Sequence, residues 1–114
     1  MNKLFSELTE TRIDKARGGE GHVIRKVVFS EEETMGKTTL CAIQTVPPGS
    51  SIGVHSHDPD VEVFHVLSGT IRVIDNGVEK DLVAGDSNFS GKGGSHGVVN
   101  VSNEDAVMLC IIIK

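Results

Sequence analysis

The stretch "GSSIGVHSHDPDVEVFHVLSG", residues 49–69, places three of the chain's five histidines in a segment that is otherwise typical of β-strands. His55 and His57 are two residues apart, and side chains at that spacing on a strand point to the same face. Glu62 begins the next strand-like run, where antiparallel pairing can bring its carboxylate beside the two imidazoles. His96, in "GKGGSHGVVN", is a fourth candidate because glycines allow the backbone to approach closely. These residues predict a site for one divalent transition-metal ion, such as Fe, Mn, Ni or Zn. Ca and Mg prefer oxygen ligands alone.

The rest of the chain is a series of short β-like runs separated by turn signals, without a convincing amphipathic helix after about residue 15. The expected strands cover residues 22–30, 38–46, 51–57, 61–68, 70–75, 79–84, 87–90, 95–102 and 107–114. Asn76-Gly77 predicts a type I′ hairpin, because both residues tolerate positive φ. We therefore expect an all-β sandwich or barrel over residues 21–114. Residues 1–20 would form an N-terminal arm or a short helix leading into it.

Length and charge narrow the choice of domains and partners. A chain of 114 residues is long enough for one domain with one modest core. Its 11 Lys and Arg against 16 Asp and Glu give a net charge of −5, and no basic cluster is present, so nucleic acid is not an expected partner. The longest apolar run, "AVMLCIII", is too short to span a bilayer. We expect a soluble cytoplasmic protein that does not bind membranes. Its two cysteines, Cys41 and Cys110, would be small buried hydrophobes rather than a disulfide.

Two spaced motifs resemble those of the cupins. The first is G, five residues, HxH, three or four residues, E, six residues, G. The second is G, five residues, PxG, two residues, H, three residues, N. The nine positions that match are Gly49, His55, His57, Glu62, Gly69, Gly85, Gly93, His96 and Asn100. Gly91 stands where the family usually has proline. A lone HxH would be weak, but two motifs in the right order are a strong signal.

The resemblance implies a double-stranded β-helix, or jelly-roll, barrel of the small, single-domain RmlC-like kind. It also implies that His55, His57, Glu62 and His96 are the metal ligands, which agrees with the interpretation of the residues themselves. The alternative for each residue alone is a polar group satisfied by ordinary hydrogen bonds. That alternative is weaker for the four together, since their spacing brings compatible donors to one point.

Several other residues have a possible place at the site. The candidates for lining the pocket are Phe64, Arg72, Phe89 and Asn100. The alternatives are core packing for the phenylalanines, a solvent-exposed position for Arg72, and a role in capping the sheet for Asn100. His65 should point away from the site, because the positions that share a face with Glu62 are 64 and 66. Asp60 is expected to be a turn residue, near enough to Glu62 to lie at the pocket rim.

Fold and metal do not by themselves select a reaction. One hypothesis is a metalloenzyme, such as a dioxygenase, decarboxylase or isomerase, acting on a small oxygen-rich substrate: a carboxylate, a sugar acid or an enolisable carbonyl compound. The alternative is a non-catalytic, metal-bearing module that binds or senses a small molecule. A third hypothesis is that the metal has only a structural role and stabilises the barrel. The chain has no Tyr, so the Cys–Tyr cofactor of some thiol dioxygenases is excluded. By the resemblance, an oxalate decarboxylase would need a mobile acid beside the metal, and the sequence indicates no particular residue for that role.

The C-terminal run "VMLCIII" lacks the alternation of a strand with one exposed face. Such a strand is expected to be covered on both sides, which a small barrel achieves by packing its sheet against another subunit. We therefore predict a homodimer.

Overall fold

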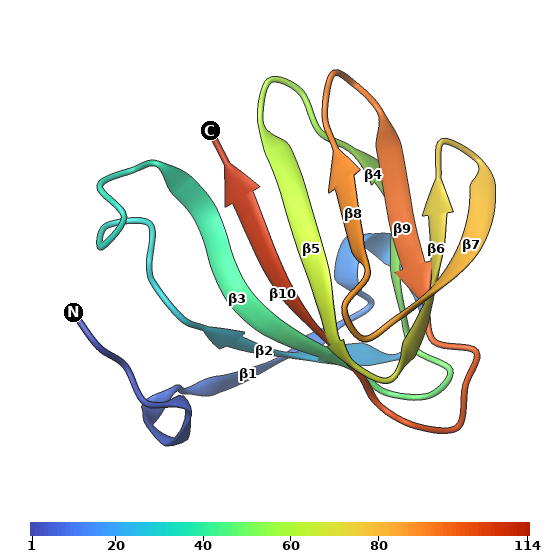
Figure 1. Cartoon of the computed structure of the whole chain (residues 1–114), viewed down its shortest axis with the longest axis horizontal. Coiled ribbons are helices and arrows are strands. Elements are labelled where there is room, and N and C mark those ends of the chain that lie inside the picture. The colour runs from blue at the N-terminus through green and yellow to red at the C-terminus, as the bar shows by residue number, and fades with distance from the viewer.

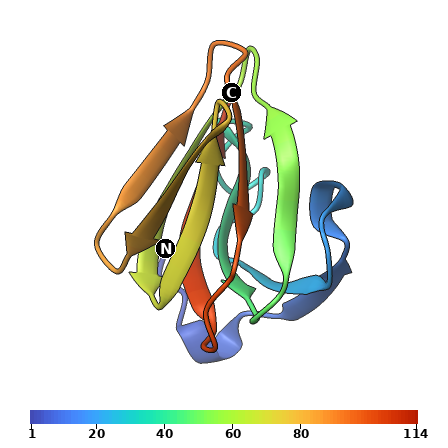
Figure 2. The same ribbon diagram turned by 90° about the vertical axis from the view of Figure 1, so that its right-hand side faces the viewer.

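Two antiparallel sheets face each other and enclose the core, as the computed structural model of residues 1–114 shows (Figures 1 and 2). The six-stranded sheet has the order β1 (Glu10–Asp14), β2 (His22–Val27), β3 (Thr38–Val46), β10 (Ala106–Ile113), β5 (Val61–Ser68), β8 (Ser87–Ser90). The four-stranded sheet has the order β4 (Ser51–Ser56), β9 (Ser95–Val99), β6 (Thr70–Asp75), β7 (Val78–Val83), with β7 as an almost wholly exposed edge. Consecutive strands repeatedly cross between the sheets, so the fold is the predicted jelly-roll barrel.

Each of the nine predicted runs forms a strand. The expected bounds are met at β3, β5, β6 and β8, and the others differ at their ends. The hairpin between β6 and β7 turns at Asn76 (φ 48°) and Gly77 (φ 82°), both in the left-handed region. This confirms the predicted turn and the physical reason for it.

The first 20 residues contain two short 3₁₀ helices, η1 (Phe5–Glu7) and η2 (Ala16–Gly18), and the strand β1, which was not predicted from the sequence. β1 pairs with β2 along its whole length, and Ile13 is its one residue that packs against the core. Its polar sequence gives no alternation, so the pairing partner rather than local preference makes it a strand. η2 follows it and packs against β4. There Gly53 lies so close to the Arg17 carbonyl that no side chain would fit.

The core lies between the sheets and is built from alternate residues of each strand. In β10 the buried residues are Ala106, Met108, Cys110 and Ile112, whereas the intervening side chains point outward and are only half-buried. The two cysteines are free, as predicted. Cys110 is in the core, and Cys41 is half-buried on the outer face of β3. The helices are single 3₁₀ turns, and none has the length and apolar character to cross a bilayer.

Asn100, the residue directly after β9, connects several segments at one end of the barrel through hydrogen bonds of its side chain. Its side chain is 1% exposed and donates hydrogen bonds to the carbonyl oxygens of Val46 (2.8 Å) and Glu104 (2.7 Å). The same amide accepts hydrogen bonds from the backbone N–H (2.9 Å) and the hydroxyl (2.7 Å) of Ser102. Asn100 therefore joins segments that are far apart in sequence and satisfies backbone groups that strand pairing leaves free.

We predict that Asn100→Ala lowers the free energy of unfolding by about 2–4 kcal/mol, because buried backbone groups lose their partners. Urea titration followed by circular dichroism measures this. The matched control is Asn103→Ala, since Asn103 is exposed in the same loop. Equal stability of the two variants would contradict the bridging role.

Candidate functional site

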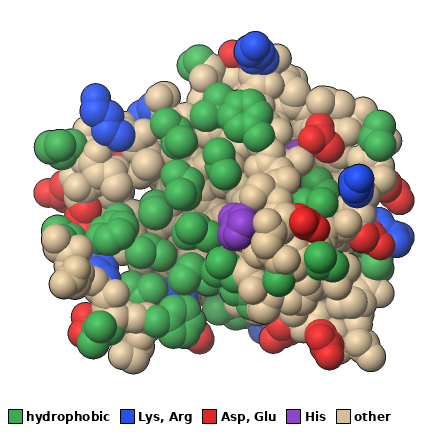
Figure 3. Space-filling view, viewed as in Figure 1, with side chains coloured by type: hydrophobic (Ala, Val, Ile, Leu, Met, Phe, Trp, Pro, Cys, Tyr) green, Lys and Arg blue, Asp and Glu red, His purple; other side chains and the backbone are tan.

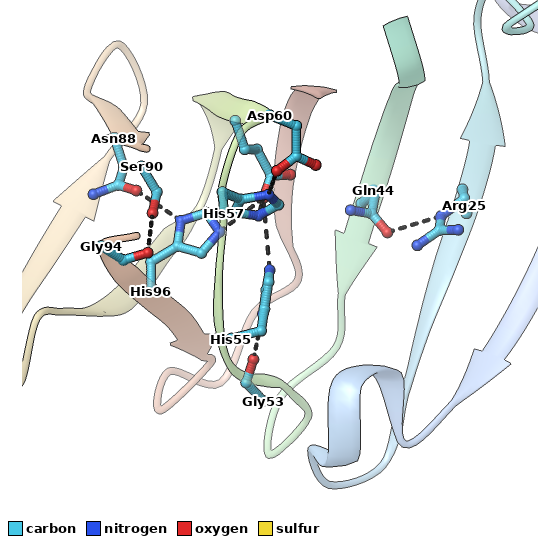
Figure 4. Close-up of polar contacts among 11 residues, drawn as sticks. Arg25, Gln44, Gly53, His55, His57, Asp60, Asn88, Ser90, Gly94 and His96 are labelled. Carbon is cyan, nitrogen blue, oxygen red and sulfur yellow. Dashed lines mark hydrogen bonds and ion pairs between the residues drawn. The ribbon is translucent and has the colours of Figure 1, made fainter. Parts of the chain in front are cut away.

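Four side chains, those of His55, His57, Glu62 and His96, meet between the two sheets. Figure 4 shows the three imidazoles pointing toward one another. His55 in β4 lies directly beside His96 in β9, because the two strands pair in that register. His57 follows β4, and Glu62 is the second residue of β5 in the other sheet. The Glu62 Oε1 atom lies 2.7 Å from His96 Nε2, 3.1 Å from His57 Nε2 and 3.8 Å from His55 Nε2. The structure thus brings together all four predicted ligands.

The route by which Glu62 reaches the histidines differs from the prediction. β4 and β5 were expected to pair as a hairpin, but β4 pairs with β9, and β5 pairs with β10 and β8. The chain crosses from one sheet to the other between His57 and Glu62. The carboxylate therefore faces the imidazoles across the interior instead of lying beside them on one sheet.

Each imidazole is held by its outer nitrogen, Nδ1, which donates a hydrogen bond to a fixed oxygen atom. The acceptors are the Gly53 carbonyl for His55 (2.7 Å), the Asp60 carboxylate for His57 (3.2 Å) and the Asn88 amide oxygen for His96 (2.9 Å). Because these oxygens only accept, each Nδ1 carries a hydrogen. In a neutral ring, the Nε2 lone pair is then free to face Glu62. This is the arrangement that proteins use to orient metal-binding histidines.

Two of these acceptors, Asp60 and Asn88, belong to residues that were not predicted from the sequence to orient a histidine. Asp60, expected in the turn, also orients His57. Asn88 was not predicted from the sequence to have a role at the site. Its side chain is itself oriented, because its Nδ2 donates to the Asp75 carboxylate (2.9 Å). This second hydrogen bond directs the Asn88 oxygen toward His96. Only the pairing of β5 with β8 shows that Asn88 and His96 share the interior, so spacing along the chain gives no signal for it.

Glu62 is anionic at neutral pH. Burial raises the pKa of its carboxyl, but the facing imidazoles of His55, His96 and His57 outweigh burial when their Nε2 atoms carry protons. The pKa is lowered to about 2. In the absence of a metal ion, protons on the Nε2 atoms stabilise this carboxylate, and a metal cation among the four residues would take the place of those protons.

The donor set and its size fit a metal ion. The four ligand atoms lie within 4.8 Å of one another. Bonds of about 2.0–2.2 Å from one ion would place two ligand atoms up to about 4.4 Å apart, so the observed limit exceeds the span of one ion by only a few tenths of an ångström. Three of the four residues are buried and His55 is half-buried. The cluster is therefore positioned to bind a metal ion.

A cavity of about 220 Å³ opens beside the cluster, and three of its four side chains, those of His55, Glu62 and His96, line it. Most of the remaining wall is apolar, made by Ile13, Ala16, Leu40, Ile52, Phe64, Val98, Met108, Cys110 and Ile112. Its other polar side chains are Arg17 from η2, Arg25 from β2 and Gln44 from β3. Arg25 donates a hydrogen bond from Nε to Gln44 Oε1 at 3.1 Å (Figure 4).

Of the four residues predicted to line the pocket, Phe64 lines the cavity and the other three do not. Arg72 lies between the buried residues Ile71 and Val73, so it points outward, where its Nε donates to the Asp81 carboxylate at 2.8 Å. Arg72 therefore has the solvent-exposed position that was given as the alternative to lining the pocket. Asn100, as described above, connects segments at one end of the barrel.

Phe89 was also wrongly predicted to line the pocket. It is 58% exposed and pairs with Val63 on the outer face of the six-stranded sheet. β8 is a short edge strand whose inward residues are polar. Its one aromatic residue, Phe89, was expected to point inward because it is apolar, but it points outward. His65 points away from the site, as predicted, and bonds to the hydroxyl of Ser87 (2.7 Å).

The arginines in the cavity wall are Arg25 and Arg17, and Arg72 is not among them. Arg25 shares the inward face of β2 with the fully buried Val23. The sequence "HVIRKVV" has apolar residues at both parities, so it does not reveal which face is inside. Gln44 was missed for a related reason, because the buried face of β3 was not identified.

Comparison with known proteins identifies the family to which this chain belongs. Residues 42–112 match the Cupin domain family, and the chain therefore belongs to the cupins.

Particular relatives extend this result. The chain is 39% identical over 108 residues to a protein of Thermotoga maritima named oxalate-binding protein, covering 95% of this chain and 89% of that protein. It also superimposes on the crystal structure of a predicted oxalate decarboxylase from Thermotoga maritima with a TM-score of 0.95 and 38% identity, covering 99% of this chain and 98% of the other. An RmlC-like cupin from Shewanella frigidimarina shares the fold, with a TM-score of 0.75 and 20% identity over 98% of this chain and 89% of the other.

We predict that Asn88→Ala weakens binding of a divalent metal ion by about 10-fold to 100-fold, because the His96 ring loses the partner that orients it. Competition against a chromophoric chelator measures the affinity. Ser87→Ala is the matched control on the same strand, since Ser87 is exposed and contacts His65 outside the site. The same affinity in both variants would show that the Asn88 hydrogen bond does not orient His96.

Proposed function

We propose that this cupin holds one divalent transition-metal ion with His55, His57, His96 and Glu62, and that it binds a small carboxylate at that ion. The observation that carries the proposal is the three-fold arrangement of Nδ1 hydrogen bonds, which directs three Nε2 atoms toward one buried carboxylate. A single buried histidine needs such a hydrogen bond only to satisfy its own ring. Three histidines oriented in this way toward one point are typical of metal ligands.

The chemistry of the donors indicates the class of metal. Three imidazoles and one carboxylate suit Fe, Mn, Ni or Zn, whereas Ca and Mg prefer oxygen ligands alone. Four protein ligands leave coordination positions free on a six-coordinate ion. When bound, the ion supplies a Lewis acid that attracts oxygen atoms of a ligand.

The cavity restricts the ligand to a small one. Its volume of about 220 Å³ lies below the roughly 300–1,000 Å³ of pockets that hold drug-sized molecules. The relatives named oxalate-binding protein and predicted oxalate decarboxylase support a carboxylate of oxalate's size. The mostly apolar wall would exclude water and strengthen the attraction between the ion and an anion.

Binding without turnover is the better supported of the two functions. Apart from the cluster itself, the cavity contains no histidine and no carboxyl group that could move a proton. Cys110 lines it, but burial raises the pKa of this thiol to about 12, so the thiol stays protonated. An enzyme such as a decarboxylase, dioxygenase or isomerase is the second candidate, supported by the name of the structural relative.

The test begins with protein purified without added metal or chelator, analysed by elemental mass spectrometry. We expect about one equivalent of a transition metal in the wild type, and its loss in His96→Ala and Glu62→Gln, because each removes one of four ligands. His65→Ala is the matched control, since it removes a histidine outside the cluster. Circular dichroism checks that each variant is folded.

Oxalate is then titrated into metal-loaded and metal-free wild type by calorimetry, and carbon dioxide and formate are assayed in the same samples. Binding that requires the metal, without products, supports the binding function. Metal-dependent formation of products would replace it with the enzyme. A wild type that retains no metal, even after reconstitution, would contradict both.

We also propose that two copies associate through the outer face of the six-stranded sheet. One row across it joins Phe89, Val63, Ile111 and Cys41 in register, and all four side chains are apolar. Hydrophobic side chains gather over β3, β10 and β5 in Figure 3. Continuous apolar patches on one face are typical of protein–protein contacts, and one face meeting itself gives a two-fold dimer.

We predict a dimer for the wild type and a monomer for Val63→Glu, because the substitution places a charge in the centre of the apolar row. Light scattering coupled to size-exclusion chromatography measures the mass. Val78→Glu, at an exposed position on the other sheet, is the matched control and should leave the mass unchanged. A monomeric wild type would refute the dimer.

A further inference from the structure

Arg25 is the one basic residue that projects into the cavity from a strand of the barrel, and it has no acidic partner. Lys3, Arg12, Lys26, Arg72 and Lys114 all form ion pairs with carboxylates. The other basic group in the cavity wall, Arg17, is an exposed residue of η2. A partly buried guanidinium without an acid is costly unless an anion neutralises it.

The contact with Gln44 orients Arg25 without neutralising its charge. The two residues are paired in register on β2 and β3, and Gln44 is 3% exposed. Only the Nε atom of Arg25 is engaged by this hydrogen bond. The structure gives its two terminal nitrogens no hydrogen-bond partner, and neither is a fully buried, unsatisfied atom. The side of the guanidinium that can grip a carboxylate with two hydrogen bonds is therefore available to a ligand.

The environment of Arg25 favours an anion. Burial lowers the pKa of Arg25, and the field of Arg17 acts in the same direction, whereas Glu62 and Cys110 act against it. Arg25 and three members of the cluster, His55, Glu62 and His96, border the same small cavity. A ligand held at the cluster by one end would meet Arg25 with the other.

We propose that Arg25, held by Gln44, binds the second carboxylate of the ligand and makes the site selective for short dicarboxylates over monocarboxylates. This inference rests on the proposed function, since the first carboxylate is held at the metal. The planar guanidinium matches a carboxylate in shape as well as charge. The cavity of about 220 Å³ limits the spacer between the two carboxylates to a few atoms.

The experiment compares two ligands on metal-loaded protein by calorimetry. Oxalate has two carboxylates, and glycolate chelates a metal through one carboxylate and a hydroxyl. The variants are Arg25→Met and Arg25→Gln, two neutral replacements, so that failure of one to fold does not prevent the test. Arg72→Met is the matched control, because Arg72 is an exposed arginine outside the cavity. Elemental analysis of each sample gives its metal content.

We expect the wild type to prefer oxalate. Removal of the Arg25 charge should weaken oxalate binding by about 10-fold to 100-fold, while glycolate binding changes by less than about 2-fold. Arg72→Met should match the wild type for both ligands. Metal content should be unchanged throughout, since Arg25 is not one of the four ligands.

Failures of the two proposals are distinguishable. If wild type and Arg25 variants hold metal and bind oxalate equally well, the Arg25 inference is overturned and the metal site stands. Equal losses of oxalate and glycolate affinity would also overturn it, because Arg25 would then not distinguish the second carboxylate. A wild type that takes up no metal overturns the proposed function and this inference together.

Discussion

The hydrogen bonds at the outer nitrogens of three histidines are the constraint on which the site depends. The acceptors for His55, His57 and His96 come from a strand carbonyl, a turn carboxylate and an amide on the opposite sheet. Each acceptor is placed by a different part of the barrel. The direction of the three Nε2 atoms is thus a property of the whole fold, and the cluster does not depend on a single local motif.

The same interior has an uneven distribution of charge. Glu62 contributes one negative charge to the cluster, and a divalent ion bound there would leave the cluster positive. Arg25 adds a second positive charge in the same cavity wall. Most of the remaining surface is apolar, and the small anion that we propose as the ligand would be held by these positive charges. A metal ion at the cluster and the arginine would both attract such an anion, because both would carry positive charge.

The sequence predicted what spacing determines. It identified the four clustered residues, the nine strands and the turn at Asn76, because these depend on patterns within a few residues. It did not predict which strands pair, so Glu62 was expected beside the histidines and not across from them. It could not tell inside from outside where a strand is apolar on both faces, as in β2, so the arginine of the cavity was sought at Arg72. β1 was missed because its partner strand, not its composition, makes it a strand.

The two edges of the four-stranded sheet determine whether strands of other copies can add to it. β7 is open to solvent, but its Glu79, Lys80 and Asp81 are exposed charges along the edge. At the other edge, η2 packs on β4 where Gly53 meets Arg17. Charged or covered edges do not accept further strands, and this protects β proteins from aggregating edge to edge. Copies of this barrel are therefore steered away from open-ended fibrils built by extending this sheet, and contact through faces produces assemblies of finite size.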